Sequence, residues 1–348
     1  MNAFTRAIVI HAPHDLRLED WAIDAPGENQ VQVRIGRGGI CGSDLHYYHH
    51  GGFGTVRIQQ PMVLGHEIAG TVAAVGAGVT SVAPGDLVAV SPSAPCGQCR
   101  YCLAGMPNHC LDMRFYGSAM RNPPVHGGFR EVLTCRADQA HRLPPGTDLA
   151  EAAFAEPLAV CLHAARQAGS LLGQRVLVSG CGPIGALSVL AARHGGAKEV
   201  VVTDLMDEPL ALALRIGADR AINMAADPHG LAPYAADKGT FDVVFEASGA
   251  ASAIAAAAAA ARPGATIVQL GLGGAETALP LNLFVAKELS LRGTFRFHEE
   301  FGWAADFIAK RTIDVRPLLS AVLPMAQAKQ AFDLASDRKR SMKVQLAF

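Results

Sequence analysis

Residues 175–185 read RVLVSGCGPIG, a short apolar strand that leads into a glycine-rich turn and then into helix-forming residues. Gly180, Gly182 and Gly185 have the G-x-G-x-x-G spacing of a dinucleotide-binding turn. In such a turn Gly180 would bend the chain sharply, Gly182 would let the backbone approach a pyrophosphate, and Gly185 would let the helix pack closely on the strand. The pyrophosphate would then lie at the N-terminus of the helix.

The next predicted strand, EVVVTD, strengthens this interpretation because it ends in an acidic residue. Asp204 follows Gly185 by 19 residues, a spacing that lets its carboxylate accept hydrogen bonds from the adenosine ribose. The carboxylate would repel a 2′-phosphate, and residues 205–208 contain no arginine to neutralise it, so we expect NAD rather than NADP. The alternative is a glycine-rich turn without a ligand. The expected coenzyme-binding residues are Gly180, Gly182, Pro183, Ile184, Gly185 and Asp204.

The surrounding pattern predicts an α/β fold with two domains. From about residue 174, short apolar strands alternate with segments of helical length, which is typical of a doubly wound parallel sheet. The predicted strands are 175–180, 199–204, 220–223, 241–247, 266–271 and 289–295, and the predicted helices are 183–194, 207–216 and 251–261. Residues 1–150 contain short Val- and Ile-rich runs separated by turn residues and are expected to be mostly β. A helix over 301–311 and a strand over 342–348 are expected to return to this first domain.

Length and composition exclude several classes of protein. The 348 residues suit two domains, and 30 basic against 31 acidic residues leave a net charge of −1, without the basic surplus of a nucleic-acid-binding protein. The first 15 residues contain an apolar run of only four, too short for a secretory signal. A cytoplasmic location is therefore expected, with no membrane or nucleic-acid partner.

Four of the eight cysteines lie within PCGQCRYCLAGMPNHC, residues 95–110. Cys96, Cys99, Cys102 and Cys110 form a C-x2-C-x2-C-x7-C array, and four thiolates suit a closed tetrahedral zinc site. Such a site leaves no position open for a substrate, so this zinc would be structural. Disulfides, a redox switch or an iron–sulfur cluster are the alternatives.

A second set of potential ligands is dispersed along the chain. It comprises Cys41 in GGICGSDLHYY, His66 and Glu67 in MVLGHEIAG, and Glu156 in AEPLAV. A thiolate, an imidazole and carboxylates suit a zinc ion that keeps one position open for water or an alcohol. Residues of these types are also commonly found as hydrogen-bonded core groups, so their spacing alone does not establish a site.

The motifs together resemble a known family. GGICGSDLHYY, PMVLGHE, the four-cysteine loop, AEPLAV and SGCGPIG occur in the order found in zinc-dependent medium-chain dehydrogenases, and the resemblance covers nearly the whole chain. GSDLHYY, PMVLGHE, EPLAV and FRF are similar to the sorbitol (polyol) dehydrogenase branch. Within that branch MRFYGSAM, AEPLAVCLHAARQAG, LRGTFRF and MKVQLAF are similar to the L-idonate 5-dehydrogenases.

This resemblance implies a GroES-like catalytic domain over 1–154 and 293–348, a Rossmann domain over 155–292, and an active site in the cleft between them. It implies two zinc ions per chain, one structural and one catalytic, and a homo-oligomer, either a dimer or a tetramer. The catalytic zinc would be held by Cys41, His66 and Glu67, with Glu156 either a direct ligand or the residue that holds the zinc-bound water.

The resemblance also implies roles for residues around the metal. Ser43 and His46 match the hydroxyl–imidazole relay that carries the substrate proton to solvent. The expected substrate-contacting residues are Tyr47, Phe115, Arg296 and Phe297. A sugar-acid carboxylate needs a cationic partner, for which Arg296 is preferred among several candidates, namely Arg114, Arg121, Arg130 and His298.

We therefore expect hydride transfer between NAD and a secondary alcohol, with L-idonate oxidised at C5 to 5-keto-D-gluconate. Sorbitol or another polyol is the alternative substrate. A different class of protein, a dinucleotide-binding relic without catalysis, would lack the open metal site. A zinc count of about two per chain would support the enzyme, and a count of about one would support the relic.

Overall fold

Six parallel strands form the sheet to which the glycine-rich turn belongs. In the computed structural model, which describes residues 3–274 and 276–348, their order is β15-β14-β13-β16-β17-β18. The strands are β13 (Arg175–Ser179), β14 (Glu199–Asp204), β15 (Arg220–Asn223), β16 (Phe241–Glu246), β17 (Ala261–Gln269) and β18 (Ser290–Gly293). Numbered from β13, this order is 3-2-1-4-5-6, the arrangement of a dinucleotide-binding sheet. The expected α/β fold with a parallel Rossmann sheet is confirmed.

Three helices of this sheet begin and end close to the predicted residues, namely α5 (Pro183–His194), α6 (Asp207–Arg215) and α8 (Ala251–Ala260). Two short helices, α7 (Ala232–Ala235) and α9 (Leu281–Lys287), were not predicted. The alanine-rich helix α8 stops one residue early because Ala261 already has an extended backbone and begins β17.

The other domain is built around a seven-stranded sheet with the order β12-β8-β7-β3-β20-β19, in which β11 also pairs with β3. Its strands are β3 (Gln30–Gly39), β7 (Glu67–Val75), β8 (Leu87–Val90), β11 (Val132–Arg136), β12 (Ala140–Arg142), β19 (Leu319–Pro324) and β20 (Lys343–Ala347). Smaller sheets pair β1 (Ala3–Ala12) with β2 (Asp15–Ile23) and β6 (Met62–Val63), β4 (Gly52–Phe53) with β5 (Val56–Arg57), and β9 (Ser93–Ala94) with β10 (Arg114–Phe115).

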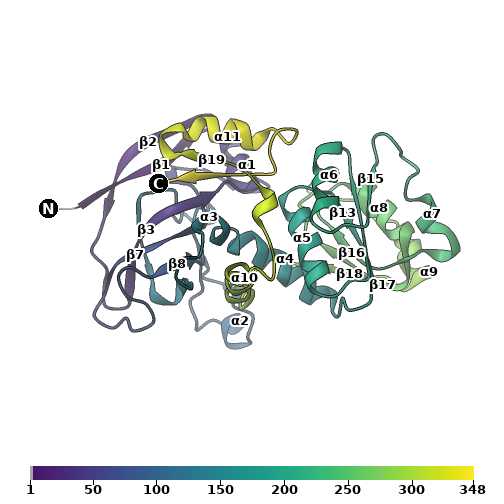
Figure 1. Cartoon of the computed structure of the whole chain (residues 1–348), viewed down its shortest axis with the longest axis horizontal. Coiled ribbons are helices and arrows are strands. Elements are labelled where there is room, and N and C mark those ends of the chain that lie inside the picture. The colour runs from purple at the N-terminus through teal and green to yellow at the C-terminus, as the bar shows by residue number, and fades with distance from the viewer. Residues whose placement is uncertain (1–2, 275) are drawn as a thin grey trace.

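Two strands of the seven-stranded sheet come from the far end of the sequence. β20 runs antiparallel to β3, with Gln345 opposite Gly39, and β19 lies parallel to β20. Figure 1 shows these late segments, in yellow, against the purple strands of the first domain. The remaining helices of this domain are α1 (Gly42–His50), α2 (Arg100–Leu103), α3 (Leu149–Ala152) and α11 (Ala328–Ser336).

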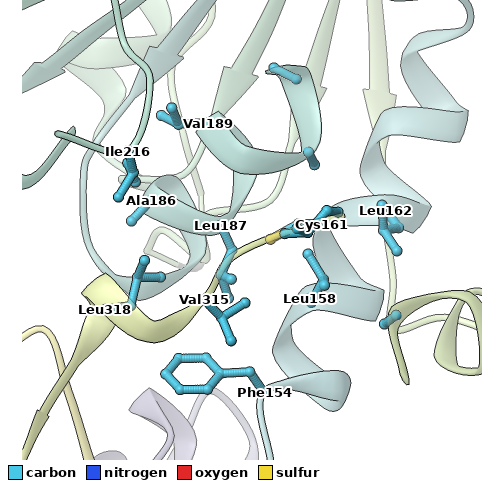
Figure 2. Close-up of a cluster of buried hydrophobic side chains, with 14 of the residues drawn as sticks. Phe154, Leu158, Cys161, Leu162, Ala186, Leu187, Val189, Ile216, Val315 and Leu318 are labelled. Carbon is cyan, nitrogen blue, oxygen red and sulfur yellow. The ribbon is translucent and has the colours of Figure 1, made fainter. Parts of the chain in front are cut away.

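Two further helices, α4 (Ala155–Ala168) and α10 (Glu300–Ala309), lie between the two sheets and pack on one another. Sequence patterning assigned no helix to 155–168, because buried residues occupy most faces of α4 and leave little polar periodicity. Pro157 is accommodated because it lies in the first turn. Figure 2 shows Phe154, Leu158 and Cys161 packed with Leu187 of α5 and Val315, so that one hydrophobic cluster extends across both domains.

Within the described residues, no helix combines the length and the apolar character needed to cross a membrane.

Candidate active site

The dispersed ligand candidates converge at one end of the seven-stranded sheet. Cys41 is the N-cap residue of α1, Glu67 is the first residue of β7, and His66 directly precedes that strand. One ligand atom from each of the three side chains lies within 4.8 Å of the others. His66 and Glu67 are buried, with 4% and 1% of their surface exposed. A thiol, an imidazole and a carboxylate are therefore clustered at one point.

The hydrogen bonding of this cluster is incomplete without a cation. His66 Nδ1 and Glu67 Oε2 are buried and have no hydrogen-bond partner in the described structure. Gly39 of β3 leaves room for the carboxylate, because a Cβ atom there would lie 2.1 Å from Glu67 Oε2. Buried polar atoms are rarely left unpaired, and nitrogen, sulfur and oxygen donors are the usual ligands of Zn²⁺. The residues present thus fit a zinc ion.

Two charged residues that sequence reasoning did not single out support the cluster. Lys343 of β20 donates to Glu67 Oε1 at 2.6 Å and to the carbonyl of Ile40 at 3.1 Å. Burial alone would lower the pKa of Lys343, but the charge of Glu67 raises it, so the ammonium group remains charged. Asp44 accepts hydrogen bonds from the backbone N–H groups of Cys41 and Gly65. Its Oδ1 lies 3.9 Å from His66 Nδ1.

Glu156, in the first turn of α4, faces the same region but lies outside the group of three ligand atoms. Burial raises the pKa of Glu156 to about 8, with His66 opposing the shift and Glu67 adding to it. The side chain is 6% exposed. The sequence did not decide which of the two glutamates would bind zinc directly. In the structure Glu67 belongs to the group of three ligand atoms, whereas Glu156 lies next to that group.

The four-cysteine loop brings its sulfur atoms together as predicted. The ligand atoms of Cys96, Cys99, Cys102 and Cys110 all lie within 4.8 Å of one another, and all eight cysteines of the chain are free thiols. Cys99 Sγ lies 3.6 Å from Cys102 Sγ and 4.0 Å from Cys110 Sγ. A tetrahedral zinc with 2.3 Å bonds separates its sulfur ligands by about 3.8 Å, so the loop fits this ion.

The glycine-rich turn borders a cavity of about 560 Å³, which Gly180, Gly182, Asp204 and Ser248 help to line. Gly180 has a φ of +87°, and Gly185 carries no side chain because a Cβ atom there would lie 1.9 Å from the carbonyl oxygen of Gly180. A Cβ atom at Gly182 would meet no atom within 4 Å, so this residue faces open space. The turn thus offers a cradle that fits a dinucleotide.

The chain matches two protein-family models and proteins of known activity. The family model described as the alcohol dehydrogenase GroES-like domain matches residues 27–145, and the zinc-binding dehydrogenase model matches residues 183–310. The chain is 42% identical to L-idonate 5-dehydrogenase (NAD(P)(+)) of Escherichia coli K12 over 348 residues, which is 100% of both proteins. It belongs to the zinc-binding dehydrogenase family.

Other relatives place this zinc-binding dehydrogenase near the polyol branch. Sorbitol dehydrogenase of Bos taurus is 37% identical over 332 residues, covering 94% of this chain and 92% of that protein. The crystal structure of the Escherichia coli L-idonate 5-dehydrogenase matches with a TM-score of 0.96 over 100% of this chain and 99% of that one. The family and branch expected from the motifs are confirmed.

The zinc-binding dehydrogenase carries Phe115 and Arg296 next to the three-ligand cluster. The Phe115 ring lies 5.7 Å from the His66 ring, and the Arg296 guanidinium lies 4.2 Å above the Phe115 ring. Burial lowers the pKa of Arg296 to about 10, while the nearby charge of Glu156 opposes that shift. Arg296 therefore faces the same site as Glu156.

The predicted relay and substrate residues differ in their exposure. Ser43 is half-buried and His46 is exposed, both on α1, and burial lowers the pKa of His46. Tyr47 is buried, and its hydroxyl accepts a hydrogen bond from the N–H of Ala119 at 2.9 Å. Phe297 differs from the prediction, because it is 2% exposed and belongs to the hydrophobic core rather than to a cavity wall.

The predicted coenzyme-binding residues do not all line the same cavity. Pro183 lines a smaller cavity of about 190 Å³ between the domains, together with Gly42 and Met342. The side chain of Ile184 is partly buried and packs against the core. Among the lining residues of the larger cavity that sequence reasoning missed is its arginine, Arg338, which no local motif marks.

Proposed function

We propose that this zinc-binding dehydrogenase oxidises the C5 hydroxyl of L-idonate to 5-keto-D-gluconate with NAD as the hydride acceptor. The observation that carries the proposal is the convergence of Cys41, His66 and Glu67 within 4.8 Å. In this proposal residues 1–154 and 293–348 form the catalytic domain and residues 155–292 bind the coenzyme. The 42% identity to the Escherichia coli L-idonate 5-dehydrogenase supports the choice of substrate.

Different residues would bind the metal, orient the substrate and transfer the proton. When bound, zinc supplies a Lewis acid that lowers the pKa of an alcohol, and NAD accepts the hydride. Cys41, His66 and Glu67 would hold the zinc, and Glu156 would orient water or substrate beside it. Ser43 and His46 would pass the hydroxyl proton to solvent, a role that suits the exposed position of His46 on α1.

Arg296 supports a sugar acid over a neutral polyol. Its guanidinium carbon lies 4.2 Å from the centre of the Phe115 ring and 4.9 Å from the centre of the Phe295 ring. The guanidinium donates a hydrogen bond to Met120 Sδ, which is a weak acceptor. Within the described chain it forms no ion pair with a carboxylate. In an extended hexonate, C1 and C5 are about 5 Å apart, so a carboxylate at Arg296 leaves the C5 hydroxyl free to reach towards His66. A bidentate guanidinium–carboxylate pair would fix the substrate's orientation.

A substrate panel tests the proposal. Purified enzyme is assayed with L-idonate, sorbitol and other polyols, with NAD, before and after removal of zinc by a chelator. We expect the highest kcat/KM with L-idonate and loss of activity on chelation, with recovery when zinc is returned. Activity with sorbitol but none with L-idonate would contradict the proposed substrate and leave the proposed zinc-dependent mechanism unchanged. Full activity without zinc would contradict the zinc-dependent mechanism, and so would the absence of dehydrogenase activity in protein that holds about two zinc ions per chain.

We further propose a structural zinc in the four-cysteine loop, a cytoplasmic location and a homo-oligomer. An exposed sheet edge supports the oligomer. All four residues of β18, at the edge of the parallel sheet, are exposed, and Leu272, Leu281 and Val285 are large apolar residues more than 60% exposed in the same domain. Pairing of this edge with a second copy would cover it. Light scattering coupled to gel filtration should give the mass of a dimer or tetramer.

A further inference from the structure

The carboxylate of Asp204 already has a cationic partner in this structure. Arg338 donates to Asp204 Oδ2 at 2.8 Å, and the same oxygen accepts the N–H of Cys181 at 2.7 Å. The other oxygen accepts the N–H groups of Leu205 and Met206. Asp204 is 7% exposed as a residue, so its charge is held at the wall of the coenzyme cavity by donors on every side. The wall is therefore not acidic overall.

Arg338 comes from a segment far from the coenzyme-binding sequence. It lies in the turn between α11 and β20, 134 residues after Asp204, and so reaches the parallel sheet from the GroES-like domain. About half of its side-chain surface, 49%, is exposed, compared with 4% for the side chain of Asp204. The carboxylate is thus fixed while the guanidinium has room to turn towards a ligand.

The position of Arg338 in the cavity limits what it can contact. It lines both the 560 Å³ cavity, with Gly180 and Asp204, and the smaller cavity that contains Pro183. Among the described residues that line the larger cavity, Arg338 is the one basic side chain and Asp204 the one acidic side chain. A ribose whose hydroxyls bind Asp204 would therefore have its 2′-oxygen within reach of the guanidinium.

We propose that Arg338 binds the 2′-phosphate of NADP, so that the site accepts NADP as well as NAD. A guanidinium presents a planar fork of donors that matches a phosphate, and it neutralises the repulsion expected from Asp204. The expectation of NAD alone considered only residues 205–208, where there is no arginine. This inference rests on the proposed function only in that the cavity binds a nicotinamide coenzyme.

Two nucleotides that differ by one phosphate test the inference without any turnover. Adenosine 2′,5′-bisphosphate and 5′-AMP are titrated against the NADH complex, and displacement is followed by NADH fluorescence. We expect the wild-type protein to bind the bisphosphate at least as tightly as 5′-AMP. In Arg338→Gln the bisphosphate affinity should fall about 10-fold or more, while the 5′-AMP affinity changes less than about threefold, because a lost charge-assisted hydrogen bond has this magnitude.

Two further variants complete the design. Arg338→Lys keeps the charge and should recover part of the bisphosphate affinity. Arg340→Gln removes the same charge two residues away from an exposed position and should leave both affinities unchanged. Thermal unfolding of each variant establishes that it is folded.

Several outcomes would overturn the inference. Equal losses for both nucleotides in Arg338→Gln would assign the arginine to the 5′-phosphate. No change in either affinity, or a wild-type protein that binds 5′-AMP but not the bisphosphate, would leave Arg338 only a structural partner of Asp204. Wild-type protein that binds neither NADH nor the nucleotides would remove the coenzyme site altogether. Absence of L-idonate oxidation alone would contradict the proposed substrate and leave these binding results intact.

Discussion

Glu67 and Glu156 illustrate how two identical side chains can have different tasks. A carboxylate oxygen of Glu67 lies within 4.8 Å of the ligand atoms of Cys41 and His66, and Lys343 donates to Glu67 Oε1. We predict that Glu67→Gln lowers the zinc content from about two to about one ion per chain, because it weakens one of the three protein ligands. Glu156→Gln should retain the zinc but lower kcat. Metal analysis by mass spectrometry after dialysis distinguishes the two variants.

Loss of zinc in Glu156→Gln together with its retention in Glu67→Gln would reverse this assignment. Glu67→Gln also leaves the buried Lys343 without its carboxylate partner, so thermal unfolding is measured in parallel. A variant that has unfolded gives no information on the ligand.

Ser43 is the residue through which the proposed proton relay is tested. Ser43→Ala removes the hydroxyl, and kcat should fall by about 100-fold because general acid–base catalysis has this magnitude. The zinc content and the affinity for NADH should stay the same. Ser43→Thr keeps a hydroxyl and should retain more activity than Ser43→Ala. Unchanged turnover in the alanine variant would remove Ser43 from the mechanism.

The spacing of the four cysteines was sufficient to predict that their sulfur atoms meet, whereas the family resemblance was needed to predict that Cys41, His66 and Glu67 meet. Lys343 and Arg338 could not be found in this way, because their partners are 276 and 134 residues distant and no local pattern links them. Phe297 illustrates a different limit. A motif that places an aromatic beside Arg296 does not reveal that its ring turns into the core.

At the scale of elements, a buried carboxylate connects α4, α10 and the turn that carries Arg296. Glu300 is fully buried, and its Oε1 lies 3.0 Å from His163 Nδ1 and accepts from Arg166 at 2.6 Å. Its Oε2 accepts the N–H of His298 at 2.8 Å. Burial alone would raise the pKa of Glu300, but the hydrogen bonds from His163 and His298 lower it to about 2.

This shift predicts a pH-dependent stability. Because the pKa of Glu300 is lower in the folded state than its ordinary 4.5, its contribution is complete above about pH 5 and is lost as the pH falls towards 2. The contribution at neutral pH is at most about 3 kcal/mol. Glu300→Gln should therefore lower the free energy of unfolding at pH 6, and the difference from wild type should shrink by pH 3.

Urea unfolding at the two pH values measures this difference. Glu299→Gln is the matched control, because Glu299 is half exposed and also pairs with Arg166. We expect a change below about 1 kcal/mol for it at either pH. A difference between Glu300→Gln and wild type that is independent of pH would contradict the assigned pKa.

Elements with clear start and stop signals were predicted well from the sequence. Helix α5 follows a glycine turn and has the predicted bounds, as does strand β14. Helix α4 was missed because buried residues occupy most of its faces and leave only a few polar positions such as the exposed Arg166, so its formation depends on packing against α5 and α10. The very short strands of the first domain, such as β6, are defined only by the partners with which they pair.

At the scale of the whole molecule, one hydrophobic cluster connects the two domains (Figure 2). Phe154 is 1% exposed and lies between α3 and α4. We predict that Phe154→Ala lowers the free energy of unfolding by about 3–5 kcal/mol, because it leaves a cavity in the shared core. Phe4→Ala, at a side chain that is 68% exposed, should change it by less than about 0.5 kcal/mol.

Differential scanning calorimetry provides the measurement for this pair of variants. We expect Phe154→Ala to shift the unfolding of both domains, since residues of both belong to the cluster. A shift confined to one transition would indicate that the two domains unfold independently of this contact.

The pairing of β20 with β3 sets an order for biosynthesis. Lys343 reaches Glu67 only after 276 further residues have been translated, and the sheet strand that carries it fills a place beside β3. The intervening parallel sheet can fold during translation, because its strands follow one another in the chain before β19 and β20. The Lys343–Glu67 ion pair therefore forms only after Cys41, His66 and Glu67 have all been translated, and a chain that ends before residue 343 lacks the ammonium group that balances the buried Glu67 carboxylate.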